Sequence, residues 1–460
     1  MKKHLLTVLL IAAFAITLLP SVPANDYEDP YAFELQFTDV SDNDTFYEAV
    51  VWAVQESVTS GTSDTAFSPE LTCTRGQVVT FLWRAKGFPE PKSYDNPFSD
   101  VAPGSYYETA VLWAVENAVT AGTSEETFSP DDTCTWAHIL TFLWRANGKP
   151  QPLQGGITVD WEHSWYKSAV AWADSTGILG VDREDFDPER PCSRGTTVTW
   201  LFHDAVKTVS TADELANAIW PGRIVYLEAG SYDLTAWAEA AVSEDRSPEG
   251  GYVRIGLAAD GYEFQIHGVS LLRLRSAPGA EGKVKLIAQP RYAEVMSFAD
   301  CDILELTGLT LGHTETGRCE GGVLRFEGCE SVYLEHMDLY GCGTYGIETR
   351  DVGRLTVLDS VIHDCSYGMM QLYSTVYAEF DGCTFRDCQE YVMLTVNGTA
   401  AFFNDCVFKD NTWGEYGAFL SCSDDDQTIV MFSRCALEEK ALQELAAMSS
   451  SGKHVSGDSI

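Results

Sequence analysis

Residues 98–145, FSDVAPGSYYETAVLWAVENAVTAGTSEETFSPDDTCTWAHILTFLWR, decide the fold of the first half, because the chain contains this pattern three times. Each copy has an Ala-Val pair followed by Trp-Ala, then a Phe-Ser-Pro or Phe-Asp-Pro turn and a Cys-Thr or Cys-Ser pair. The Ala-Val pairs begin at Ala49, Ala110 and Ala169, at intervals of 61 and 59 residues. So many matched positions at a near-constant spacing indicate duplication. We therefore expect three copies of one structural unit.

Each copy predicts a helix, a loop and a second helix. In the first copy, apolar residues recur at helical spacing over residues 47–54, and Gly and Pro follow in residues 61–69. Thr74 then precedes Gln77 by three residues, which is the spacing of a capping box at the start of a second helix. One such pair is too small to enclose a core. We expect the three pairs to share one, as an all-α pseudo-threefold unit with Trp52, Trp113 and Trp172 inside it.

These copies resemble the S-layer homology (SLH) family. In that family three modules form one unit that binds secondary polysaccharides of the bacterial cell wall, and an Arg at the start of the second helix contacts the anionic ligand. Arg75 and Arg194 occupy that place here, whereas the middle copy has Trp136, and Gln77 stands where the family has Glu. The resemblance implies a glycan-binding set of Arg75, Gln77, Trp136 and Arg194. The alternatives are that the arginines pair with the acidic surface and that Trp136 packs.

The second half repeats every 23 residues. Two columns show this spacing: Leu334, Val357, Phe380 and Phe403, then Leu339, Ile362, Phe385 and Phe408. One turn of backbone per repeat, with like residues stacked inside, is typical of a parallel β-helix. We expect a capping-box helix at residues 211–219 to cover the first coil and residues 437–448 to cover the last.

This half resembles the right-handed parallel β-helix (pectate-lyase-like) superfamily. The resemblance is carried by Pro290-Arg291-Tyr292-Ala293, Gly312-His313-Thr314-Glu315, Cys319-Glu320-Gly321-Gly322-Val323-Leu324 and Gly341-Cys342-Gly343-Thr344-Tyr345-Gly346. The fold class is therefore multidomain, with an all-α SLH pseudo-trimer and an all-β right-handed parallel β-helix. Because that fold hosts lyases, hydrolases, adhesins and inert spacers, it does not assign an activity.

The start of the chain is typical of an exported protein. Lys2 and Lys3 precede a long apolar run and a small-residue cleavage site, which predicts a signal peptide and a secreted, cell-wall location. The predicted segments are a signal peptide at 1–24, a linker at 25–36, modules at 37–87, 98–148 and 157–207, a β-helix at 208–438, and a helix and flexible tail at 439–460.

The composition restricts the partners. The net charge of −38 predicts that the surface repels nucleic acid and anionic lipid. No later stretch is long and apolar enough to predict a membrane span. Six of the 13 cysteines fall in two stacked columns, Cys342, Cys365 and Cys388 and then Cys383, Cys406 and Cys435. Side chains in such columns lie parallel and fit a disulfide badly, so we interpret these cysteines as buried, reduced thiols.

Several residues are candidates for chemistry in the β-helix. The catalytic candidates are His313, Glu315, Arg318 and Glu320, which cluster in one loop, and Arg350, which is predicted on an outward strand face. Asp364, Asp387 and Asp410 recur at one turn and could bind Ca²⁺, although Asp at such a turn more often accepts backbone hydrogen bonds. A predicted outward strip, which lacks the Asp cluster of the lyases, contains Arg325, Glu327, Glu348, Arg350, Met370 and Tyr373.

The sequence favours a non-enzymatic protein without a cofactor. We expect SLH modules to hold it on cell-wall polysaccharide while the β-helix serves as a structural module or binds an external glycan. The alternatives are an envelope-tethered polysaccharide lyase or glycoside hydrolase acting through the β-helix, and a freely secreted protein whose modules no longer bind the wall.

Overall fold

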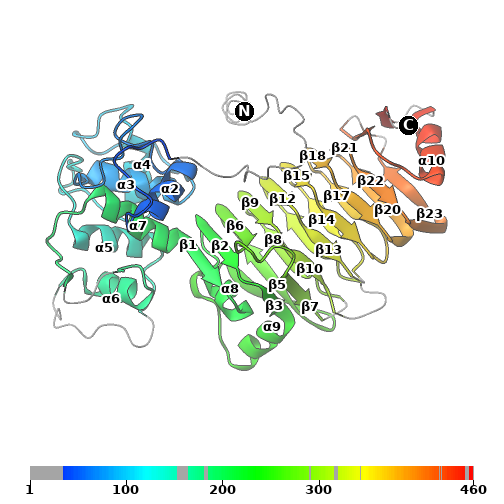
Figure 1. Cartoon of the computed structure of the whole chain (residues 1–460), viewed down its shortest axis with the longest axis horizontal. Helices are drawn as coiled ribbons and strands as arrows, with labels where there is room; N and C mark the ends of the chain where they lie inside the picture. Colours follow the sequence, from blue (N-terminus) through cyan, green and yellow to red (C-terminus); the bar gives the residue numbers. More distant parts are fainter. Residues whose placement is uncertain are drawn as a thin grey trace.

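The structure is a computed structural model that describes residues 35–152, 164–180, 185–289, 292–314, 320–341, 343–423, 425, 427–450 and 455–458. A helical unit lies at one end, and a stack of strands extends from it to the other end (Figure 1). The predicted signal peptide, together with Glu315, Arg318 and Cys342, lies outside the described residues.

The three predicted helix pairs are present. They are α2 (Tyr47–Gln55) and α3 (Arg75–Ala85), α4 (Glu108–Glu116) and α5 (Trp136–Ala146), and α6 (Lys167–Ser175) and α7 (Arg194–Ala205). The predicted capping box starts α3, because the Thr74 hydroxyl accepts from the Gln77 N–H and the Gln77 side chain accepts from the Thr74 N–H. Trp52, Trp113 and Trp172 are buried in the shared core, as expected.

The three pairs close into a ring. The N–H of Cys134 donates to the carbonyl of Cys73, the N–H of Cys192 donates to that of Cys134, and the N–H of Cys73 donates to that of Cys192. These bonds are 2.9–3.0 Å long. The cysteine at the same place of each copy therefore lies at the pseudo-threefold axis.

The β-helix begins without a linker, since α7 ends at Ala205 and the first strand starts at Val206. Within the described residues the strands form three sheets. The ten-stranded sheet contains β1 (Val206–Val209), β2 (Arg223–Leu227), β6 (Leu271–Ser276), β9 (Ile303–Thr307), β12 (Ser331–Glu335), β15 (Arg354–Leu358), β18 (Tyr377–Asp381), β21 (Ala400–Asn404), β24 (Ile429–Ser433) and β25 (Val455–Gly457). The eight-stranded sheet contains β4 (Val253–Ala258), β5 (Gly261–His267), β8 (Met296–Ala299), β11 (Leu324–Glu327), β14 (Ile347–Arg350), β17 (Met370–Tyr373), β20 (Gln389–Asn397) and β23 (Thr412–Cys422). The seven-stranded sheet contains β3 (Gly230–Asp233), β7 (Val284–Ala288), β10 (Thr310–His313), β13 (Asp338–Tyr340), β16 (Val361–His363), β19 (Thr384–Arg386) and β22 (Val407–Lys409).

The predicted register is confirmed. Leu334 pairs with Val357, Val357 with Phe380, and Phe380 with Phe403, all in parallel strands. The second column, from Leu339 to Phe408, pairs in the same way. Phenyl rings stack along these columns, and the ring centroids of Phe380 and Phe403 are 4.8 Å apart. The period of 23 residues therefore records one coil of the solenoid.

In the cysteine columns, Cys365, Cys383, Cys388 and Cys406 are buried and Cys435 is half-buried. The Sγ atoms of Cys383, Cys406 and Cys435 lie 3.3–3.5 Å from carbonyl oxygens of the preceding coil. Asn411 continues another column, and its amide oxygen accepts from the backbone N–H of Cys388 at 3.0 Å. These side chains satisfy backbone groups where the coils turn.

Helices cover both ends of the solenoid. The predicted first cap is α8 (Ala212–Ala218), and α10 (Glu439–Ser450) covers the last coil and contacts β23 (Figure 1). The sequence analysis missed α9 (Leu234–Ser243), which packs on β5, the short 3₁₀ turn Glu249–Gly251, and the antiparallel hairpin of β4 and β5. No helix in the described part of the chain has the length and apolar character needed to cross a bilayer.

The stacked column predicts a large difference between two adjacent phenylalanines. Phe403 is fully buried between Phe380 and Phe432, whereas Phe402 faces outward beside Tyr377. Phe403→Ala should lower the free energy of unfolding by about 3–5 kcal/mol, because it removes a ring and leaves a cavity. Urea unfolding followed by circular dichroism measures this. Phe402→Ala is the matched control and should cost clearly less; equal losses would contradict the assigned register.

Candidate functional site

Arg75, the first residue of α3, points into the second copy of the repeat. Its Nε donates to the carbonyl of Phe128 at 3.1 Å, and its Nη2 donates to the carbonyl of Ala121 at 3.0 Å. The guanidinium carbon lies 4.8 Å from the centre of the Phe128 ring, and the residue is 8% exposed. Burial lowers the pKa of Arg75 from its ordinary value. Arg75 therefore fastens the first copy to the second.

The other two copies make the equivalent contact. Arg194 starts α7 and donates from Nε to the carbonyl of Phe67 at 2.8 Å, in the first copy. Trp136 starts α5 and packs against Phe186 and Trp200 of the third copy, with ring centroids 5.7 and 5.3 Å apart. The first residue of each second helix thus locks into the next copy, which closes the ring.

Because of these contacts, the predicted glycan-binding residues are mostly buried or already hydrogen-bonded within the protein. Arg75, Trp136 and Arg194 are each at most 8% exposed, and Gln77 is held in its capping box. The two arginines donate to carbonyl oxygens and pack on aromatic rings, rather than pairing with the acidic surface as the alternative expected. Glycan contact by these four residues stays a prediction.

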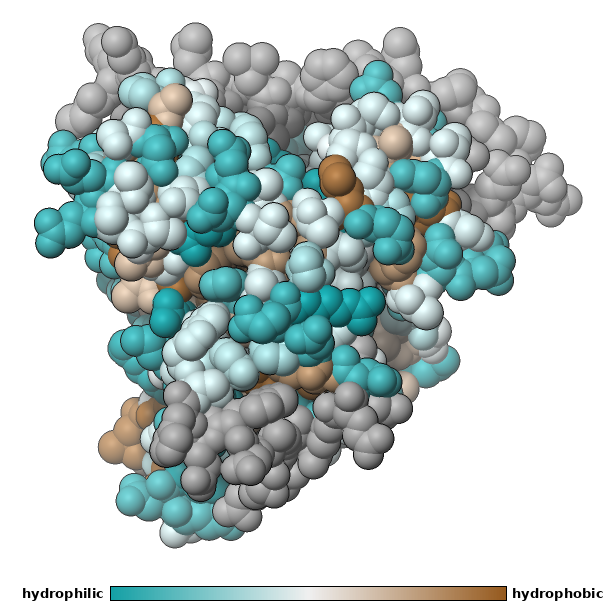
Figure 2. Space-filling model, turned by 90° about the vertical axis from the view of Figure 1, so that its left-hand side faces the viewer, coloured by the Kyte–Doolittle hydropathy of each residue, from teal (hydrophilic) through white to brown (hydrophobic). Residues whose placement is uncertain are grey.

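The space beside each helix start is bordered by aromatic side chains that the sequence analysis missed. A Cβ on Gly76 would lie 3.2 Å from the ring of Tyr107, so a larger residue would crowd the contact between the first and second copies. Tyr106 is 58% exposed, and Trp165, at the matching place in the third copy, is 54% exposed and packs on His138. Figure 2 views this end of the molecule and shows apolar residues mainly in recesses between polar lobes. In the sequence, these residues could have been found as an aromatic residue just before the first helix of each copy.

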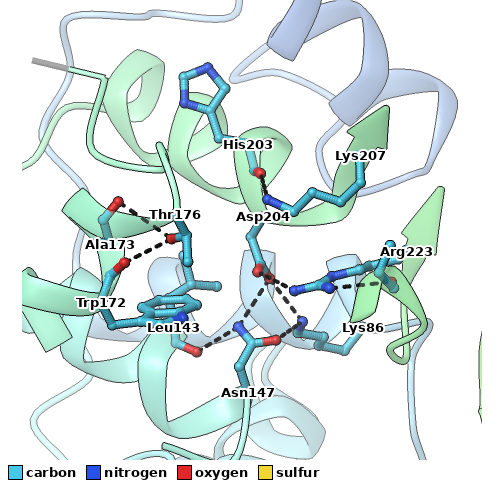
Figure 3. Close-up of polar contacts among 11 residues, drawn as sticks. Lys86, Leu143, Asn147, Trp172, Ala173, Thr176, His203, Asp204, Lys207 and Arg223 are labelled. Atoms are coloured by element: carbon cyan, nitrogen blue, oxygen red, sulfur yellow. Dashed lines mark hydrogen bonds and ion pairs between the residues drawn. The ribbon is translucent and has the colours of Figure 1, made fainter. Parts of the chain in front are cut away.

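A buried charge cluster joins the helical unit to the β-helix (Figure 3). Asp204 accepts from Lys86 Nζ at 2.9 Å and from Asn147 Nδ2 at 3.1 Å, and its other oxygen lies 3.4 Å from Arg223 Nη2. Lys86, Asn147 and Asp204 come from the three helix pairs, and Arg223 comes from β2. The side chains of Lys86, Asp204 and Arg223 are at most 9% exposed. The cluster therefore ties all four parts together.

The two cations of the cluster and a helix end determine its electrostatics. Burial alone would raise the pKa of Asp204, but Lys86 and Arg223 hold that pKa well below its ordinary value. Two cations then face one carboxylate. Lys86 caps the C-terminal end of α3, where the helix dipole is negative and favours a positive charge. A second bridge, from Arg273 in β6 to Glu56 at the end of α2, is 2.5 Å long.

Of the predicted catalytic candidates, the structure describes His313, Glu320 and Arg350, while Glu315 and Arg318 lie outside the described residues. His313 is 3% exposed, its Nε2 lies 2.9 Å from the carbonyl of Ala293, and burial lowers its pKa. Glu320 is exposed, and Arg350 is exposed on β14 in a different sheet from His313. His313 is a packed side chain that a polymer cannot reach, so this placement gives no support to a surface site built on it.

The three recurring aspartates occupy the same left-handed turn position of successive coils. Asp364, Asp387 and Asp410 have φ values of 56°, 56° and 58°, a left-handed conformation that Asp adopts more readily than most residues. Asp364 contacts His363 at 2.5 Å, and Asp387 contacts Arg386 at 2.6 Å. Among the described residues, no three His, Cys, Asp or Glu side chains are placed to hold a metal ion.

The predicted outward strip is correct in part. Arg325 pairs in register with Glu348, and its Nη2 donates to Glu327 at 3.1 Å. Met370 was placed wrongly, because it pairs in register with the buried Ile347 and is itself fully buried. Gln371 takes the outward position beside Glu348.

Glu294, which the sequence analysis missed, lies beside this strip. It is 9% exposed, and its Oε2 has no hydrogen-bond partner among the described residues. A Cβ on Gly322 would lie 2.6 Å from that oxygen, so the glycine of the next coil makes room for the carboxyl. Burial, followed by the nearby Glu348 and Glu263, raises the pKa of Glu294 to about 8. A carboxyl whose pKa is raised in this way can act as a general acid.

Two family models match parts of the chain, one in each half. Residues 36–79 and 97–137 match the family model described as S-layer homology domain, and residues 300–460 match the model for a right handed beta helix region. The third copy is not matched, although α6 and α7 complete the ring.

Two curated proteins are similar to part of the chain. A "Cell surface protein" of Thermoanaerobacter kivui is 28% identical over 122 residues, which cover 26% of this chain and 16% of that protein. An "Endoglucanase" of Bacillus sp. (strain KSM-635) is 27% identical over 144 residues, which cover 31% of this chain and 15% of that protein. The matched segments thus span less than a fifth of either relative.

The charge cluster predicts a strong effect of one carboxylate. Asp204→Asn should lower the free energy of unfolding at pH 7 by about 3–5 kcal/mol, because Lys86 and Arg223 remain buried without a counter-charge. Because the pKa of Asp204 is lowered on folding, wild type should lose this contribution as the pH falls below about 4, and the variant should lack that slope. Urea unfolding across pH measures both effects. Asp213→Asn, which breaks the exposed pair with Arg246, is the control and should have no measurable effect.

Glu294 predicts the opposite dependence on pH. Its pKa rises from about 4.3 in the unfolded chain to about 8 when folded, so ionisation destabilises the fold as the pH rises between these values. Glu294→Gln should match wild type near pH 4 and exceed it in unfolding free energy at pH 8. The exposed Glu330→Gln variant should show no such gain. A constant difference between wild type and Glu294→Gln across the range would contradict the raised pKa.

Proposed function

Because this chain carries S-layer homology modules followed by a right-handed parallel β-helix, we propose that it is a bacterial cell-surface protein held non-covalently on cell-wall polysaccharide. S-layer homology domains in general bind such polysaccharide. The observation that carries the proposal is the closed ring in which Arg75, Trp136 and Arg194 each lock one copy to the next. The β-helix is then displayed outward as a glycan-binding or structural module.

The finer proposal is that the ligand is a secondary cell-wall polysaccharide bound beside the helix starts. The whole chain carries a net charge of −38, so an anionic glycan is attracted only where cations and helix N-termini are concentrated. Arg75 and Arg194 start α3 and α7, and the exposed rings of Tyr106 and Trp165 lie just before α4 and α6. Gln77 and Trp136 complete the predicted set.

A second candidate function is a polysaccharide lyase or glycoside hydrolase acting through the β-helix. The specific observation in its favour is Glu294, a buried carboxyl close to Glu348 and Glu263 on the eight-stranded sheet. Glycoside hydrolysis uses two carboxyl groups, of which the general acid has a raised pKa. A screen for new reducing ends and unsaturated products on purified polysaccharides, compared between wild type and Glu294→Gln, separates this candidate from a binding module.

Co-sedimentation with purified cell-wall sacculi tests the anchoring proposal. The full chain should pellet with sacculi and should stay in solution when the secondary polysaccharide has been chemically removed from them. An Arg75→Gln/Arg194→Gln variant should bind about tenfold more weakly or worse, because two charge-assisted contacts are lost. Thermal unfolding checks that this variant remains folded at the assay temperature.

The matched control is Arg246→Gln, which changes an exposed arginine of the β-helix paired with Asp213. It should pellet like wild type. Equal pelleting with stripped sacculi would rule out the polysaccharide as ligand. Unchanged pelleting of the folded double variant would remove the arginines from the site.

A further inference from the structure

An open depression of about 500 Å³ lies on β20 and β23, on the coil nearest α10. This is the end of the molecule opposite the helical unit (Figure 1). The residues around it that matter here are Gln389, Glu390, Tyr391, Trp413, Glu415 and Tyr416. Neither the family matches nor the similar proteins assign a role to it.

The depression exists because the two strands fall out of register. Glu390 is opposite Trp413 and Val392 is opposite Ala418, so residues 414–417 of β23 face only Tyr391. This bulge carries Tyr416 outward, where it is 92% exposed, and Tyr391 is 50% exposed beside it. Glu390 has a φ of 95°, a conformation that side chains other than glycine rarely adopt. Bulges and backbone strain of this kind re-aim side chains and cluster at binding sites.

The floor of the depression is held firmly. Trp413 is 6% exposed, and its Nε1 donates to Glu444 of α10 at 2.7 Å. The other oxygen of Glu444 accepts from the N–H of Phe419 at 2.8 Å, on the far side of the bulge. Lys440 lies 4.1 Å from the centre of the Trp413 ring and donates to its carbonyl. The end helix therefore fixes the bulge from behind and leaves its outer side open.

The lining favours one class of ligand. Two exposed tyrosine rings offer flat apolar faces with polar tips, which suit the faces of sugar rings. Gln389, Glu390 and Glu415 supply oxygen atoms that accept hydrogen bonds from hydroxyl groups. None of the described lining residues is Lys, Arg or His, so a polymer of uronic acids or phosphates would meet only negative charge. The rings of Tyr367 and Tyr391 meet edge-to-face at 4.9 Å, which extends the aromatic surface to the preceding coil.

We propose that this depression binds a neutral polysaccharide, with sugar rings stacked on Tyr391 and Tyr416 and hydroxyl groups donating to Glu390, Glu415 and Gln389. The inference rests on the proposed display of a glycan-binding β-helix and locates that binding at the end opposite the wall anchor. A molecule built this way holds cell-wall polysaccharide at one end and a different, uncharged glycan at the other.

Affinity electrophoresis of the full chain tests this. Native gels contain soluble β-glucan, xyloglucan or glucomannan as neutral probes, and polygalacturonate as the anionic probe. At least one neutral polymer should retard the wild type, and polygalacturonate should not. Tyr391→Ala/Tyr416→Ala should raise the Kd for that polymer about tenfold or more, because both stacking faces are removed. Tyr292→Ala removes a ring of matching exposure, 51%, elsewhere on the β-helix and should leave retardation unchanged.

Three outcomes would overturn the proposal: no retardation by any neutral polymer, retardation by polygalacturonate alone, or equal retardation of the double variant and wild type. Pelleting with sacculi is measured on the same double variant and should equal that of wild type. Loss of retardation with intact pelleting supports the site and leaves the anchor standing. Intact retardation of wild type with no pelleting means that the anchoring proposal fails while this site stands.

Discussion

The carboxylate of Asp204 is the contact on which the arrangement of the whole molecule depends. It receives Lys86 from the first helix pair, Asn147 from the second and Arg223 from the first full coil of the β-helix. A buried ion of this kind is tolerated only when every partner is in place, since an unpaired charge in the interior costs several kcal/mol. The helical ring and the solenoid therefore cannot separate at this point without exposing or orphaning charge. Together with the direct passage from α7 into β1, this contact fixes the orientation of the β-helix relative to the helical unit.

The β-helix follows a different constraint, in which each coil is the template for the next. Parallel pairing places identical positions about 4.8 Å apart, so a ring at one level is best covered by a ring at the next. The columns from Leu334 to Phe403 and from Leu339 to Phe408 show this, as do the thiols that lie against carbonyl oxygens of the coil before. The first and last coils each have one face with no neighbouring coil, so their unpaired backbone groups must be covered by another element. The helices α8 and α10 cover them.

The sequence predicted the elements that follow a repeat and missed those that do not. The helix pairs, the 23-residue register and the first end cap were predictable, because each is written as a recurring spacing or a capping box. The second cap was expected because an uncovered last coil leaves a free edge. The helix α9 and the β4–β5 hairpin come before the regular repeat begins, so no neighbouring coil reveals their register. Met370 was placed outward in error, since the regular 23-residue step from Arg325 to Glu348 continues to Gln371 and puts Met370 in the inward column of Ile347. Glu294 was missed because a lone carboxylate carries no periodic signal, although Gly322 stands 28 residues later, the same interval as between Leu306 and Leu334.

Arg75 and Arg194 show why the place of a residue can be predicted more easily than its role. An arginine at a helix start has the charge and hydrogen-bond geometry to hold an anion, and family resemblance suggests that it does. In this fold the same guanidinium groups donate to loop carbonyls of the next copy and lie on its aromatic rings. The two roles compete for donors, since each guanidinium has five N–H groups in a fixed plane and two or more are already used. Under the proposal of an acidic glycan at these helix starts, only the remaining edge of each guanidinium fork is available to the ligand, and the nearby rings of Tyr106 and Trp165 are exposed.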